Sequence, residues 1–128
     1  MSDNPFDSAV ALLPPDVQAW YATNVIPHIE QRDDEDTASP FKTGQLRATS
    51  IAGDLAPPGW DPNYWHVVLY VPVLPDWSPG FLILHEIAHA WLGHRGSASQ
   101  EEHDAHEDEA NEQVRRWLDA LGERNARA

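Results

Sequence analysis

The segment 81–92, FLILHEIAHAWL, constrains the fold of this 128-residue chain most strongly, because it is apolar on nearly every side yet contains two histidines and a glutamate. Ser78 and Pro79 before the segment and Gly93 after it are typical signals for the start and the end of a helix. A helix that is apolar all round has to lie inside a domain. Its polar side chains then need partners, which the rest of the chain must supply.

The N-terminal third of the sequence predicts one helix and one acidic loop. Apolar residues recur at spacings of three and four over residues 15–31, which is typical of an amphipathic helix, here with a bend at Pro27. The acidic stretch 31–45 has too little apolar surface to bury, so we expect a mobile loop there. Residues 1–12 and 122–128 are expected to be loose tails.

The remaining sequence predicts a small sheet and a final helix. Residues 46–52 predict a short strand, and the aromatic and β-branched run 64–71 predicts a buried one, giving a small, mostly antiparallel sheet. Ser99 opens the final helix with the spacing of a capping box, and Gly122 is expected to end it after Leu121. The fold class is therefore α+β, with an N-terminal helix, a small sheet, a central helix and a C-terminal helix.

Composition limits the partners that this chain can have. Eight Lys and Arg against 21 Asp and Glu give a formal net charge of -13, which repels nucleic acid and anionic membrane surfaces, so neither is expected as a partner. The N-terminus shows no signal-peptide pattern, and no stretch approaches the ~20 apolar residues of a membrane span, so we expect a cytoplasmic protein. Because the chain has no cysteine, any metal has to be held by histidines and carboxylates.

The sequence His85-Glu86-Ile87-Ala88-His89 is the HExxH pattern, whose two histidines lie on one face of a helix and can bind one metal ion. Glu86 lies close to the same side, where it can accept a proton from a water molecule at the metal. On a solvated surface helix these residues would be idle. Here the apolar flanks would bury them without partners, at a cost of several kcal/mol, so the pattern indicates a zinc site.

A catalytic zinc ion usually has three protein ligands, and the third has several candidates. His94 comes five residues after the motif, one short of the metzincin spacing, and is expected in a turn that follows Gly93. On the final helix, at 100° per residue, Glu107 lies within the apolar stripe, whereas Glu109 lies about 160° away from it. Glu107 is the favoured ligand, because a carboxylate on a core-facing stripe requires a cation. His103, one turn earlier on the same stripe, is its rival.

The motif and the final helix together resemble the gluzincin clan, and most of all the ImmA/IrrE-like metallopeptidases. The similarity covers about residues 64–121. It includes Phe and Leu before the HExxH motif, Leu and His after it, and a Glu-x-x-Ala-Asn helix with apolar residues seven, ten and eleven positions past the Glu. The residues of this chain at those helix positions are Glu107, Ala110, Asn111, Val114, Trp117 and Leu118.

This resemblance implies a single, minimal zincin-like metallopeptidase domain over residues 1–128, with Zn²⁺ as its cofactor. The implied zinc ligands are His85, His89 and Glu107, and the implied general base is Glu86. The expected activity is hydrolysis of a peptide bond in a protein or peptide substrate. The alternative is a zinc-binding regulatory or interaction module that keeps the site but cleaves nothing.

The chain also departs from the family pattern. It lacks the helix-turn-helix segment that often accompanies the family, and the usual Met-Pro ending after the last helix, so the substrate and regulatory role do not carry over. A second resemblance, to SprT-like proteases, rests on the His-Ala-Trp end of the motif (89–91), but the later His-Gly followed by an aromatic residue is missing.

Other residues have expected supporting roles that the sequence does not decide. Asn111, one turn after the favoured third ligand, is expected to hydrogen-bond a ligating side chain. Strand 65–71 has two open readings: its edge pairs with an extended peptide, or the strand simply completes the sheet. A hydrogen-bond donor that stabilises an oxyanion is expected from one of five residues. These candidates are Tyr64, His66, Tyr70, His103 and His106.

Overall fold

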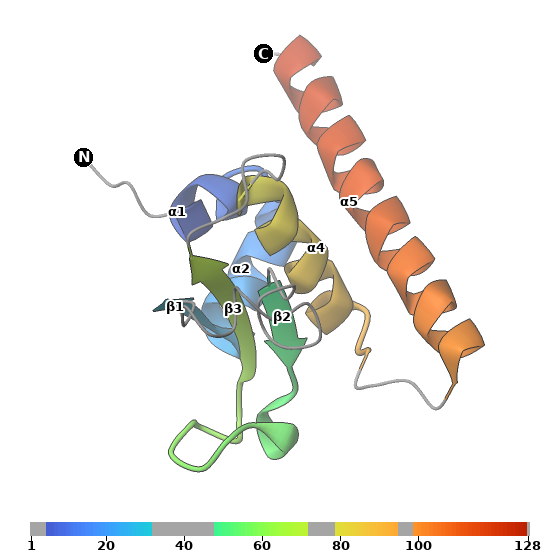
Figure 1. Cartoon of the computed structure of the whole chain (residues 1–128). Helices are drawn as coiled ribbons and strands as arrows, with labels where there is room; N and C mark the ends of the chain where they lie inside the picture. The colour runs from blue at the N-terminus through green and yellow to red at the C-terminus, as the bar shows by residue number, and fades with distance from the viewer. Residues whose placement is uncertain (1–4, 32–47, 72–78, 95–98, 128) are drawn as a thin grey trace.

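The computed structural model describes residues 5–31, 48–71, 79–94 and 99–127, which form an α+β structure (Figure 1). This part of the chain contains four α-helices, one short 3-10 helix and a three-stranded mixed sheet. In chain order the elements are α1 (Pro5–Val10), α2 (Pro15–Asn24), β1 (Val25–Gln31), β2 (Ala48–Ile51), η2 (Gly53–Leu55), β3 (Trp65–Val71), α4 (Pro79–Trp91) and α5 (Gln100–Arg127). The expected mobile loop 31–45 lies, apart from Gln31, outside the described residues.

The sheet has the order β1-β3-β2, with β3 in the centre. β1 runs parallel to β3 from the pair Val25 and Trp65 onward, whereas β2 runs antiparallel to β3. The predicted strands 64–71 and 46–52 are confirmed as β3 and, within the described residues, as β2. The prediction of a mostly antiparallel sheet is wrong, because the longer of the two pairings is parallel.

The predicted helix 15–31 ends at Asn24, and its second half is the strand β1. Pro27 explains the break. Inside a helix a proline has no N–H to donate, and its ring clashes with the carbonyl group of the preceding turn. β-Branched residues at 25, 26 and 29 favour an extended backbone. Proline is tolerated in β1 because this strand lies at an outer position of the sheet, beside β3 alone among the described strands.

Both segments expected to be loose tails contain helix. In α1, Phe6 is 2% exposed, and Leu13, just after the helix, is fully buried. These two side chains belong to the same hydrophobic core as α4 and α5. α5 continues through Gly122 to Arg127, because one glycine inside a helix costs only about 1 kcal/mol and the residues that follow it include no proline.

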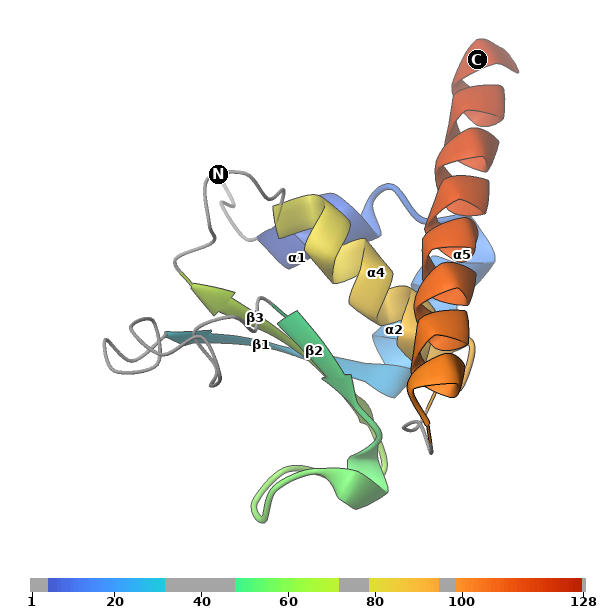
Figure 2. The same cartoon turned by 45° about the vertical axis from the view of Figure 1, so that its right-hand side comes forward.

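The helices α1, α2 and α4 cover one face of the sheet, and α5 packs along α4 (Figure 2). Ile83 and Ile87 on α4 are fully buried between these layers. The predicted central helix is therefore confirmed, and the C-terminal end of α5 extends beyond the other elements (Figures 1 and 2). Among the helices of the described ranges, none has both the length and the apolar character needed to cross a membrane.

Capping hydrogen bonds fix the C-terminal end of α4 and the N-terminal end of α5. Gly93 has a φ of 75°, and its N–H donates to Ala90 O at 3.1 Å while the His94 N–H donates to His89 O at 2.9 Å. This pair of bonds is a Schellman motif, which confirms the predicted stop. At the start of α5, the Glu102 N–H donates to Ser99 Oγ at 3.1 Å, as the capping-box spacing predicts.

Candidate metal centre

Three ligating side chains converge where α5 crosses α4. His85 and His89 lie one turn apart on α4, and their Nε2 atoms are 3.1 Å apart. Glu107 of α5 brings Oε2 to 2.7 Å from Nε2 of His85 and Oε1 to 3.2 Å from Nε2 of His89. These three residues form a group that could hold a metal ion. His103, the rival third ligand, is exposed and is not part of this group.

Hydrogen bonds to the far side of each imidazole orient both rings. Nδ1 of His85 lies 2.9 Å from Oδ1 of Asn111, which fulfils the expectation that Asn111 supports a ligating group. Nδ1 of His89 lies 2.9 Å from Nδ1 of His94. A neutral imidazole has one N–H and one lone pair, so donation from each Nδ1–H leaves both Nε2 lone pairs facing the centre.

This donor arrangement fits a divalent cation. Two Nε2 lone pairs and a carboxylate at 2.7–3.2 Å from one another repel unless a positive charge lies between them. Tetrahedral zinc ligands at 2.0–2.1 Å from the ion are about 3.3 Å apart, close to the separations found here. Burial, and then the charge on His85, lower the pKa of His89 to about 4, so its imidazole is neutral, as ligation requires.

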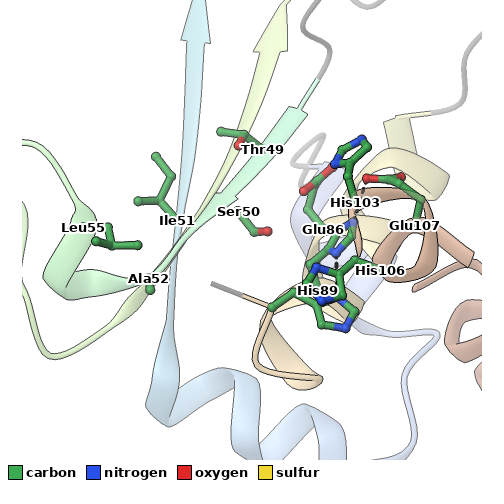
Figure 3. A pocket seen from close by; sticks show the side chains of 11 residues that line it. Thr49, Ser50, Ile51, Ala52, Leu55, Glu86, His89, His103, His106 and Glu107 are labelled. Carbon is green, nitrogen blue, oxygen red and sulfur yellow. Dashed lines mark hydrogen bonds and ion pairs between the residues drawn. The ribbon is translucent and has the colours of Figure 1, made fainter. Parts of the chain in front are cut away.

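Glu86 lines a cavity together with His89 and Glu107, and its hydrogen-bond partner there is Ser50 of β2. The cavity, of about 230 Å³, lies between β2 and the two helices, and Ser50 of β2 points toward Glu86 (Figure 3). Burial raises the pKa of the Glu86 carboxyl, which is about 7 even though His85 and the hydrogen bond from Ser50 act in the opposite direction. A carboxyl with this pKa can accept a proton near neutral pH and release it again.

The structure separates the remaining candidates for the site. His94 lies in the turn after α4, as expected, and its ring stacks on His106 with centroids 4.0 Å apart. Glu109, expected on the far side of α5, is more exposed than Glu107, but its Oε2 is 3.7 Å from Nε2 of His94. His94, His106 and Glu109 form a second group of side chains that could hold a metal ion, beside the first group.

Only two of the five candidate oxyanion donors, His103 and His106, are among the described residues that line the cavity. His66 is 1% exposed and is engaged elsewhere: its Nε2 donates to Asp61 O at 2.8 Å, and its Nδ1 faces Nε2 of His28. Of the two readings of strand 65–71, the strand that completes the sheet is confirmed and the free edge is wrong, because β3 lies in the centre of the sheet. Within the described part of the sheet, the outer strand beside the cavity is β2.

Sequence reasoning missed two contacts of this site. Nothing in the sequence indicated that Ser50 reaches Glu86, because that contact depends on how β2 packs against α4. The contact between His94 and His89 does have a local sequence signal, Gly93. Gly93 predicted a Schellman turn, and such a turn returns the next residue toward the last helical turn.

Two imidazoles from one helix turn and a carboxylate from the next helix form a candidate His-His-Glu metal site, and this donor set is one that zinc accepts. Residues 64–126 match the peptidase M78 family model, described as the IrrE N-terminal-like domain. This part of the chain, which holds β3, α4 and nearly all of α5, is similar to that family. No curated protein and no solved structure gives a significant match to the chain.

Proposed function

We propose that this protein is a zinc-dependent metallopeptidase with a zincin-like domain, in which His85, His89 and Glu107 hold the ion and Glu86 is the general base. The observation that carries the proposal is the convergence of two imidazole Nε2 atoms and one carboxylate beside a second, part-buried carboxyl group, that of Glu86. The match to a peptidase family supports the same activity and implies a protein or peptide substrate.

Each side chain then has a defined task. A bound zinc ion supplies a Lewis acid that polarises the scissile carbonyl and acidifies water. Glu86 accepts the proton of the attacking water and delivers it to the leaving nitrogen. Ser50, by donating a hydrogen bond, keeps the Glu86 carboxylate directed into the cavity. His103 and His106, on the opposite wall, are the candidates to donate a hydrogen bond to the developing oxyanion.

The substrate is proposed to bind as an extended peptide along β2. Among the described strands, β2 pairs with β3 alone, and residues 49–52 line the cavity (Figure 3). An outer strand offers backbone N–H and C=O groups to an added strand. A larger, more apolar cavity of about 630 Å³ lies next to His85 and Glu107, with walls from Phe81 and Leu118, and suits an apolar side chain of the substrate.

Metal analysis after dialysis tests the centre itself. We expect the wild type to retain zinc and a His85→Ala/His89→Ala double variant to lose it, because both imidazole ligands are gone. Glu107→Ala is expected to weaken zinc binding strongly. The matched control is His103→Ala, which removes an exposed histidine of the same helix and is expected to change zinc affinity only modestly. The reverse order for the last two variants would contradict the assignment of Glu107.

Activity separates an enzyme from a metal-binding module. Glu86→Gln is expected to keep the fold and the zinc but to lose peptide hydrolysis, typically by 10²–10⁴-fold, because only the base is removed. The measurement is cleavage of a broad peptide library by both forms, together with zinc analysis. Proteins captured from an extract by the wild type and by Glu86→Gln are also compared. If the wild type holds zinc, captures the same proteins as Glu86→Gln and cleaves none of them, the protein is a regulatory or interaction module instead.

A further inference from the structure

A second group of ligating side chains lies beside the first. One nitrogen each from His94 and His106 and one carboxylate oxygen of Glu109 lie within 4.8 Å of one another. We propose that these three residues form a second metal site, which takes a divalent transition ion such as Zn²⁺ after the first site is filled. This inference goes beyond the proposed hydrolysis and does not depend on it.

The fold holds these side chains together from two elements. His106 and Glu109 are three residues apart on α5, so they lie on one face of that helix. The Schellman turn at Gly93 places His94 against them, with its ring almost parallel to that of His106. The side chains of His94 and His106 are only 9% and 19% exposed, so both rings are packed in place.

Charge and access favour an incoming cation at this position. The side chain of Glu109 is 57% exposed, which leaves it free to rotate and leaves the site open to solvent. A further carboxylate is close, since Oε1 of Glu102 is 3.8 Å from Nε2 of His106. Two imidazoles with one or two carboxylates are a ligand set that zinc accepts. The formal net charge of -13 also attracts cations to the chain.

Binding at this site needs small movements of the side chains. Nε2 of His94 and Oε2 of Glu109 are 3.7 Å apart, whereas tetrahedral zinc ligands are about 3.3 Å apart. The two rings are stacked with an angle of 13°, so one ring has to tilt before both lone pairs meet at one point. Glu109, being exposed, can follow by rotation alone.

His94 serves both sites, which makes the second site the weaker one. Its Nδ1 accepts the hydrogen bond from Nδ1–H of His89, so its Nε2 carries the proton of the neutral ring. An ion at Nε2 displaces this proton to solvent or requires the hydrogen bond to His89 to break. Either change opposes binding, and the first equivalent of metal therefore goes to His85, His89 and Glu107.

The test is a titration of the metal-free full chain with Zn²⁺ against a chromophoric chelator. We expect the wild type to bind two equivalents, the second more weakly. His106→Gln and Glu109→Gln are each expected to bind the first equivalent as the wild type does. Their affinity for the second equivalent is expected to fall by more than the ~10–100-fold that follows the loss of a residue that only hydrogen-bonds a metal ligand. His103→Gln is the matched control, an exposed histidine of α5 outside the group, and is expected to keep both equivalents.

A reciprocal variant separates this proposal from the proposed function. His85→Ala/His89→Ala is expected to lose the tight equivalent and to retain one weak equivalent, which His106→Gln then removes. A wild type that binds only one equivalent would overturn the second site while leaving the first intact. Two equivalents that survive in both His106→Gln and Glu109→Gln would also overturn it. Circular dichroism of each variant checks the fold, and the exposed Glu109 provides a variant that leaves the core untouched.

Discussion

Asn111 and His94 determine which imidazole nitrogens face the metal centre. Each lies 2.9 Å from the Nδ1 atom of one α4 histidine. A ring held in this way presents its Nε2 lone pair in a fixed direction, so less ordering is needed when an ion binds. HExxH spacing alone cannot do this, because a helix position fixes where a ring begins but not how the ring is rotated.

The Asn111 contact leads to the first prediction. Asn111→Ala is expected to weaken zinc binding by ~10–100-fold, because the His85 ring loses the acceptor that fixes its orientation. Asn111→Asp, which keeps an oxygen acceptor, is expected to lose much less. Asp108→Ala, an exposed neighbour on α5, is the control. Chelator competition measures all three, and equal affinity for Asn111→Ala and wild type would refute the role of this side chain.

At the scale of elements, a glycine just after α4 and a glycine inside α5 have opposite effects. Gly93 has a positive φ, a conformation that costs an L-residue roughly 1–2 kcal/mol, and its turn returns His94 to His89. Gly122 lies within α5, and a Cβ atom there would meet nothing within 4 Å. The sequence suggested a stop at both positions. Only the first has the turn that a stop requires.

Alanine substitutions at these glycines should therefore change stability in opposite directions. Gly93→Ala is expected to lower the free energy of unfolding by about 1 kcal/mol or more and to weaken zinc binding, since His94 shifts with the turn. Gly122→Ala is expected to raise it by ~0.5–1 kcal/mol without any effect on zinc. Urea unfolding and zinc titration of both variants provide the comparison. A change of the same sign in both would contradict this account.

Elements with local signals were predictable, and those with distant partners were not. α4 and β3 were predicted correctly, because their apolar patterns and flanking prolines are visible within a dozen residues. β1 was read as helix, because the spacing of its apolar residues also fits a helix and its partner β3 lies about 40 residues away. α1 was missed because six residues have little intrinsic tendency to form a helix without the core they pack on.

That dependence of α1 on the core can be measured. Phe6 is 2% exposed in the core that α1 shares with α4. Phe6→Ala is expected to lower the free energy of unfolding by ~3–5 kcal/mol, through lost apolar contact and the cavity left behind. Ser8→Ala, at an exposed position of the same helix, is the control and should change it by less than about 0.5 kcal/mol. Denaturant unfolding checks both; a loose tail would tolerate either change.

At the scale of the whole molecule, a second cluster of histidines lies in the sheet, away from the candidate metal centre, and contains the buried His66 and the half-buried His28. His28 donates from Nε2 to Nδ1 of His66, and its ring stacks on Trp60 with centroids 4.0 Å apart. Burial, and then the charge on His66, lower the pKa of His28, although Glu30 acts in the opposite direction. This cluster joins β1, β3 and the turn between η2 and β3, so its protonation state bears on the stability of the sheet.

The sign of this effect follows from proton linkage. When the folded pKa of a histidine is lower than its unfolded value of 6.5, the unfolded chain binds more protons as the pH falls, and the free energy of unfolding decreases. Other shifted groups act as well: the pKa of His89 is lowered to about 4, whereas that of Glu86 is raised to about 7, which gives a contribution of the opposite sign. The contribution of His28 is therefore best measured as a difference between two proteins.

His28→Phe provides that difference, because phenylalanine keeps an aromatic ring over Trp60 but cannot be protonated. Between pH 7.5 and pH 5, the metal-free wild type is expected to lose more free energy of unfolding than His28→Phe does, since all other titrating groups are shared and cancel. Urea unfolding at several pH values measures both proteins, with His103→Gln as an exposed-histidine control that should follow the wild type. If the variant loses as much stability on acidification as the wild type, His28 is not held neutral by its burial against Trp60 and His66.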